Sequence, residues 1–150
     1  MKRLRVYGCK NNPELKEEII TASTFFINSL LPRKRKYDIT VTAVNDLIDK
    51  EETFGECWSW SPNVYCIRFD KNQTQENRIK TLAHEFVHLK QFAFGELKFL
   101  TQFNIWQDKI FYHEAKYNLV PWEREASKME NVLYDRYIKF LYNSNIINNK

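Results

Sequence analysis

The sequence predicts an α+β fold, in which a small, mostly antiparallel sheet packs on three helices. Apolar and polar residues alternate in short segments near 3–8, 37–43, 54–60 and 64–70, which is typical of strands with one buried face. Three longer segments instead repeat their apolar residues at helical spacing. A chain of 150 residues has the length of one ordinary domain, so we expect a single domain over 1–150.

The first helix is expected to begin at Pro13, behind the capping residue Asn12, and to end before Pro32. Its predicted buried face consists of Leu15, Ile19, Ala22, Phe26 and Leu30. Two aromatic strands follow near 54–60 and 64–70, joined by a turn at residues 61–63, and we expect one of them to form an edge of the sheet.

A second helix is predicted from about Gln75 to Phe94, where Gly95 ends it, and weak alternation over 103–112 predicts a small ribbon. The last helix starts near Pro121. Its predicted apolar face consists of Trp122, Ala126, Met129, Leu133, Tyr137, Phe140 and Leu141. The Asn-rich tail over 143–150 offers little to pack, so we expect it to fray.

Composition excludes several classes of protein and partner. No apolar run is long enough to span a membrane, and no signal-peptide core follows the basic start. Three cysteines without such a signal predict reduced thiols and a cytoplasmic protein. The net charge of +4 is concentrated in Arg33–Lys36, which we interpret as a solvated turn rather than a nucleic-acid site. We therefore expect a monomer without a membrane or nucleic-acid partner.

The chemistry-bearing motif is His84-Glu85-Phe86-Val87-His88, of the form H-E-x-x-H, within the second helix. Residues four apart on a helix are rotated by about 40°, so both imidazoles lie on one face and can reach one Zn²⁺. Glu85 lies about 60° round from His88, too far to be the natural third ligand but close enough to contact a water beside the metal. The surrounding residues are apolar, and a buried group of this kind needs a partner, which zinc supplies.

A third ligand must come from elsewhere in the chain. A histidine at position 94 would complete a compact three-histidine site, but Phe94 occupies it. The better candidates are Glu123 and Glu125, which open the last helix on opposite sides of the buried Ala126. Helical geometry alone leaves both open, because carboxylates are common in the first turn of any helix.

The residues H-E-F-V-H-L-K-Q-F-x-x-G-E-L, followed by Y-x-x-x-P-W-E-R-E-A, resemble the gluzincins, and in particular the small single-domain minigluzincins of bacteria and phages. The resemblance covers roughly residues 54–140 and implies a zincin-like fold, with an active-site helix and a C-terminal helix that carries the glutamate ligand. It implies a zinc metallopeptidase in the cytoplasm of a bacterium or a phage-infected host.

The resemblance also implies individual roles. Glu125, which precedes a small residue, is expected to be the third zinc ligand, with Glu123 as the alternative. An acid four residues after the ligand often orients a histidine in this family, but that position is Met129, and Glu130 is turned about 100° away. Glu85 is expected to act as general base and then general acid.

Tyr117 is the expected oxyanion donor, with Tyr112 and His113 as alternatives. The strand at 64–70 resembles the gluzincin edge strand, on which a peptide or protein substrate would bind as an additional strand. Two other functions stay open. The protein could be a zinc-stabilised regulatory or interaction module with little peptidase activity, or a selective protease that cleaves one repressor-like partner.

Overall fold

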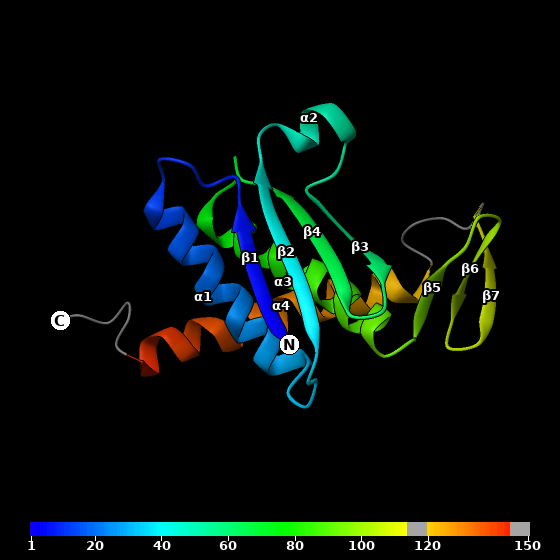
Figure 1. Cartoon of the computed structure of the whole chain (residues 1–150). Coiled ribbons are helices and arrows are strands. Elements are labelled where there is room, and N and C mark those ends of the chain that lie inside the picture. The colour runs from blue at the N-terminus through cyan, green and yellow to red at the C-terminus, as the bar shows by residue number, and fades with distance from the viewer. Residues whose placement is uncertain (114–119, 145–150) are drawn as a thin grey trace.

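The computed structural model describes residues 1–113 and 120–144 and is α+β (Figure 1). Its helices are α1 (Pro13–Leu30), α2 (Leu47–Glu51), α3 (Gln75–Ala93) and α4 (Pro121–Asn143). Its strands are β1 (Lys2–Tyr7), β2 (Tyr37–Val44), β3 (Gly55–Ser61), β4 (Val64–Asp70), β5 (Leu97–Phe99), β6 (Phe103–Trp106) and β7 (Lys109–Tyr112).

The larger sheet has the strand order β1-β2-β4-β3 and is mixed. β1 pairs with β2 and β2 with β4 in parallel, and only β3 runs antiparallel to its neighbour β4. The expectation of a mostly antiparallel sheet is therefore wrong for this sheet. For β1 and β2 the reason is the connection through α1, because a chain that crosses over through a helix returns in the same direction as it left.

The two aromatic strands form the predicted hairpin, and β3 is an edge of the sheet. The strand at 64–70, β4, is instead central, with β2 on one side and β3 on the other. The expectation that this strand is the edge is therefore wrong. Its backbone is already paired on both sides, so a peptide could not be added to it, whereas its neighbour β3 is an edge strand.

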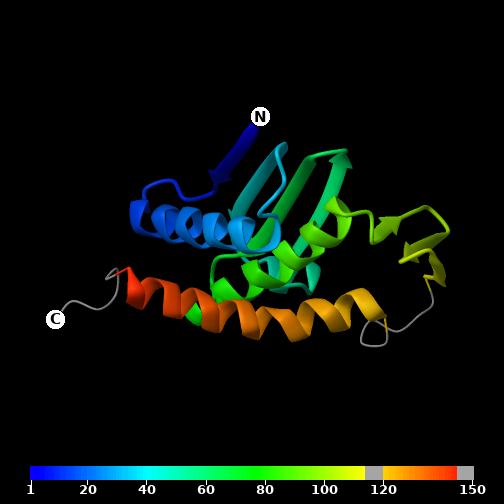
Figure 2. The same ribbon diagram turned by 90° about the horizontal axis from the view of Figure 1, so that it is seen from below.

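The three long helices, α1, α3 and α4, lie on one face of the sheet in two layers (Figure 2). α1 and α3 pack directly on the strands, and α4 crosses them on the side away from the sheet. The predicted apolar faces of α1 and α4 are confirmed at most positions. The side chains buried on these faces are Leu15, Ile19, Ala22 and Phe26 on α1 and Trp122, Ala126, Leu133, Tyr137 and Leu141 on α4.

The short helix α2 was not expected from the sequence. Its capping residue Asp46 has φ 57° and makes no side-chain hydrogen bond to the helix. Instead, the Ile48 backbone N–H donates to Asp70 Oδ2, at the end of β4, over 3.1 Å. This helix start depends on a residue 22 positions away, which no local pattern reveals.

A second, antiparallel sheet of β5, β6 and β7 stands beside the C-terminal end of α3 (Figure 1). It has its own small apolar cluster, made of Leu97, Trp106, Val120 and Trp122. Because Val120 and Trp122 open α4, this cluster fixes the start of the helix that carries Glu123. Among the described residues, no helix combines the length and hydropathy that a membrane crossing needs.

Gly8 lies where the chain leaves β1, with φ 84°, and a Cβ there would sit 1.9 Å from the Ala43 carbonyl oxygen. We expect Gly8→Ala to lower the free energy of unfolding by roughly 2–4 kcal/mol, from left-handed strain plus this backbone clash. Gly95→Ala is the matched control, because Gly95 has φ 70° but no heavy atom within 4 Å of a Cβ. It should cost only about 1–2 kcal/mol in the same urea denaturation series, and equal losses would contradict the clash.

Candidate metal centre

Helix α3 carries the H-E-x-x-H motif in its second half, as expected. Thr74 caps its N-terminus by accepting a hydrogen bond from the Asn77 backbone N–H over 3.2 Å. One helical turn separates His84 from His88, and their Nε2 atoms lie 3.2 Å apart. The predicted convergence of the two imidazoles is therefore present in the structure.

Helix α4 brings a carboxylate to these two nitrogens, and it is that of Glu123. Its Oε2 lies 3.1 Å from His84 Nε2, and its Oε1 lies 3.2 Å from His88 Nε2. Among the described residues, these three form the cluster whose donor atoms could hold a metal ion. Glu125, the expected third ligand, does not join it. The structure therefore groups the alternative, Glu123, with the two histidines.

The geometry of α4 explains the choice. Residues two positions apart on a helix are rotated by about 200°, so Glu123 and Glu125 lie on opposite sides of the buried stripe of α4 and contact different residues of α3. The burial of Trp122 and Ala126 sets the rotation of the helix and turns Glu123 toward α3. The Glu125 Oε1 instead accepts a hydrogen bond from Gln91 Nε2 over 3.1 Å.

Glu130 also contacts the cluster, contrary to the expectation that it is turned away. Its Oε2 lies 2.7 Å from His84 Nδ1. The angle of about 100° is the rotation from position 129 to Glu130, the next residue. Glu130 lies seven residues after Glu123, a rotation that differs from two full turns by only about 20°. Both acids therefore share one face of α4. Glu130 thus orients one imidazole, the role for which Met129 is unsuited.

Gln91 orients the other imidazole, and the sequence analysis missed it. This side chain is fully buried. Its Nε2 donates to the Trp122 carbonyl oxygen and to the Glu125 carboxylate, both over 3.1 Å, and neither of these groups can donate. The amide oxygen must therefore face His88, where Oε1 lies 2.8 Å from Nδ1. A glutamine three residues after the second histidine, on the same helical face, was the available signal.

These contacts determine which nitrogen of each imidazole ring carries the proton. Nδ1 of His88 must donate to Gln91, and Nδ1 of His84 must donate to the Glu130 carboxylate. In a neutral ring the other nitrogen, Nε2, then carries the lone pair, and both Nε2 atoms face Glu123. Hydrogen bonds of this kind select the tautomer that binds a metal and hold the ring in place.

The donor spacing suits zinc. Bonds of about 2.0–2.1 Å in tetrahedral geometry separate neighbouring ligand atoms by roughly 3.3–3.4 Å. The three separations here are 3.1, 3.2 and 3.2 Å. Burial of His84 opposes its charged form, yet hydrogen bonds with Glu123 and Glu130 prevail and raise its pKa to about 10. The centre therefore favours positive charge, as a cation site requires.

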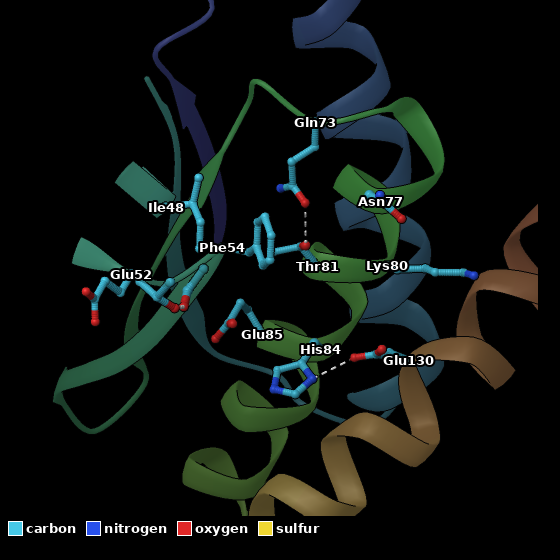
Figure 3. A pocket seen from close by; sticks show the side chains of 12 residues that line it. Ile48, Glu52, Phe54, Gln73, Asn77, Lys80, Thr81, His84, Glu85 and Glu130 are labelled. Atoms are coloured by element: carbon cyan, nitrogen blue, oxygen red, sulfur yellow. Dashed lines mark hydrogen bonds and ion pairs between the residues drawn. The ribbon is translucent and has the colours of Figure 1, made fainter. Parts of the chain in front are cut away.

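Glu85 lies beside the cluster rather than in it. It lines a cavity of about 680 Å³ together with His84, Phe54 and Gly55, between α3 and β3 (Figure 3). Burial raises the pKa of Glu85 to about 7, although the charged imidazoles of His88 and His84 act in the opposite direction. A Cβ on Gly55 would lie only 3.0 Å from Glu85 Oε1, so the glycine leaves room for this carboxylate under the edge strand.

The expected oxyanion donor Tyr117 lies outside the described residues. Of its alternatives, Tyr112 is 65% exposed and packs edge-to-face against Phe103 in the small sheet. His113 is also exposed. The geometry gives neither residue a place beside Glu85, and the oxyanion donor stays a prediction for Tyr117.

The two glutamates can be separated by substitution. We expect Glu123→Ala to weaken zinc binding by at least about 100-fold, because it removes one of three converging donors. Glu125→Ala is the matched control, because it removes the same atoms two residues away. It should weaken zinc binding by less than about tenfold. Titration against a chromogenic chelator measures both affinities. The reverse order would restore Glu125 as the ligand.

Gln91→Leu should weaken zinc binding by about 10–100-fold, because His88 loses the acceptor that orients it. The visible absorption spectrum of cobalt bound in place of zinc reports the geometry of the ligands. A change in this spectrum would therefore distinguish a misoriented His88 from a mere loss of packing. Gln91→Glu retains an oxygen acceptor for His88 and should recover most of the affinity. Unchanged affinity and spectrum in Gln91→Leu would refute the orienting role.

Comparisons with known proteins add no family to this geometry. No protein-family model, curated protein or solved structure matches the chain. The gluzincin resemblance therefore rests on the motif residues themselves, and the site must be interpreted from its own contacts.

Proposed function

We propose that the protein is a zinc-dependent metallopeptidase of the gluzincin type, with a zincin-like fold. The observation that carries the proposal is the convergence of His84 Nε2, His88 Nε2 and the Glu123 carboxylate within 3.1–3.2 Å of one another. Orienting contacts from Glu130 and Gln91 support it, because a chance meeting of polar groups would not also select the tautomer of both rings.

The number of donors favours catalysis over a structural role. Structural zinc sites are closed by four protein ligands, whereas catalytic sites have three and leave one position open. The described residues supply three donors to this centre, and His84 borders a cavity of about 680 Å³. Zinc in such a site supplies a Lewis acid that polarises a carbonyl group and activates water near neutral pH.

Glu85 is the proposed general base and acid. Its carboxylate takes the proton from the attacking water and returns it to the leaving amine, so the amine departs uncharged. Glu85 as a whole is 5% exposed and borders the same cavity as His84, which gives it access to a bound substrate without bulk water around it. A purely structural zinc site would have no need of this acid.

The proposed substrate is an extended peptide segment of a protein. β3 is an edge strand that borders the cavity, and the backbone of an edge strand can pair with an added chain. Such pairing holds main-chain atoms in register and places one peptide bond beside the zinc ligands. The proposed substrate-binding strand is therefore β3, in place of the strand at 64–70 expected from the sequence.

Glu85→Gln is the decisive substitution. It should retain one zinc per chain but lower peptide hydrolysis by about 10²–10⁴-fold, because the amide cannot accept the proton. Metal analysis and detection of new protein termini in cell extract, treated with wild type or variant, measure the two properties. Cell extract offers many protein substrates, so the assay detects both a general protease and one that cleaves a single partner.

Wild type stripped of zinc by a chelator is the control, and it should regain activity when zinc returns. If Glu85→Gln and wild type produce the same termini, or if wild type binds no zinc, the peptidase proposal fails. Stoichiometric zinc in a wild type that cleaves nothing would favour the interaction module instead.

A further inference from the structure

A second hollow, also of about 680 Å³, lies at the far end of β3 from the catalytic cavity. The catalytic cavity is bordered by Gly55, at the start of β3, and the second hollow by Trp58, Trp60 and the turn after them. The C-terminal end of α3 and β5 complete it, through Phe94 and Phe99 among others. We call this second space the aromatic hollow.

Three large aromatic side chains around this hollow face solvent. Trp60 is 70% exposed, Phe94 57% and Phe99 52%. Single exposed apolar residues are normal, but a group of them around a depression marks a contact surface. Trp58, which also lines the hollow, has a buried indole Nε1 without a hydrogen-bond acceptor in the described part of the chain. The hollow thus offers exposed aromatic surface.

A β-bulge places Trp60 at this position. Ser59 pairs with Tyr65 and Ser61 with Val64, so Trp60 is an additional residue without a backbone pairing partner on β4. Its indole Nε1 donates to Cys66 Sγ of that strand over 3.1 Å. Bulges redirect side chains and interrupt regular pairing. The end of β3 that borders the aromatic hollow is therefore built for side-chain contacts rather than for continued strand pairing.

The charges around the hollow have one sign. Lys34 and Lys98 line it, and none of the aspartates and glutamates that the structure describes does. Lys34 belongs to the basic run Arg33–Lys36, whose other three members are exposed. Among the described residues, none of these cations forms a salt bridge, whereas Arg5, Arg68 and Arg78 elsewhere are paired. The basic run interpreted from sequence as a solvated turn thus meets the aromatic hairpin here.

We propose that the aromatic hollow binds an acidic, aromatic segment of the protein substrate, at a distance from the bond that is cleaved. This inference rests on the proposed function, because it names the substrate class. The hollow and the catalytic cavity share one edge strand, and five residues from Gly55 to Trp60 span about 17 Å of extended chain. A single extended peptide can therefore occupy both, which favours a peptide over a nucleic acid as the ligand.

Binding is tested in the Glu85→Gln background, so that the probe is not cleaved. The probe is a fluorescein-labelled peptide of alternating glutamate and phenylalanine, about ten residues long, which spans roughly 33 Å when extended. Fluorescence anisotropy gives its Kd. The same peptide with glutamine in place of glutamate, and a labelled oligothymidine, are the comparison ligands.

The expected result is a rise in Kd of at least about tenfold in Lys34→Glu/Lys98→Glu, and of several-fold in Trp60→Ala. Lys10→Glu/Lys139→Glu carries the same charge change on exposed sites elsewhere and should stay within about twofold of the parent. The milder Lys34→Gln/Lys98→Gln should move Kd in the same direction, and zinc content and thermal unfolding verify that each variant is folded.

Any of three results overturns the inference: no wild-type binding up to about 1 mM peptide, equal loss in the control pair, or glutamine peptide binding as tightly as the acidic one. Tighter, hollow-dependent binding of oligothymidine would assign the site to nucleic acid instead. Zinc content and the production of new termini by wild type are independent readouts. The proposed function can therefore fail while hollow-dependent peptide binding persists, and the reverse is equally visible.

Discussion

One buried amide determines how α4 lies on α3. Gln91 donates to the Trp122 carbonyl oxygen and to Glu125 and accepts from His88, so it ties α3 to the first turn of α4. A fully buried amide that lost one of these partners would leave an unsatisfied polar atom, at a cost of about 1–3 kcal/mol. Together with the burial of Trp122 and Ala126, this cost holds α4 in the rotation that brings Glu123 to the imidazoles.

Packing at both ends of α4 reinforces that position. Near its start, Trp122 packs against Trp106 and Phe111 of the small sheet. Near its end, Tyr137 lies against Phe25 and Phe26 of α1. Between these anchors, a cluster of two imidazoles and two carboxylates is largely buried, which is costly without a cation at its centre. Metal binding and the packing of α4 should therefore stabilise each other.

The helical period was sufficient to place His84, Glu85 and His88, because their relation is internal to one helix. The third ligand depends on how two helices are rotated against each other, and a sequence records that only indirectly. One signal was available: Glu123 and Glu130 are seven residues apart and therefore share a face, whereas Glu125 has no acid at that spacing. The gluzincin resemblance, which selects the acid before a small residue, favoured Glu125 over this signal.

The sheet shows the same limit. The hairpin of β3 and β4 was predictable because its turn is local, and the parallel pairing of β1 and β2 could have been inferred from the 18-residue helix between them. The order β1-β2-β4-β3 could not, because β3 precedes β4 in the chain but lies outside it in the sheet. The short helix α2 depends on Asp70, far along the chain, and had no local signature.

These limits matter most for β3, on which both proposed binding regions depend. Gly55 at one end lets the strand approach Glu85, and the bulge at Trp60 ends regular pairing at the other. Only the few residues between them present an uninterrupted edge to an added chain. Backbone hydrogen bonds over so short a stretch are largely independent of sequence, so they cannot select one substrate from many. Selectivity must then come from side-chain contacts beyond the two ends of the strand, in the cavity beside Glu85 and in the aromatic hollow.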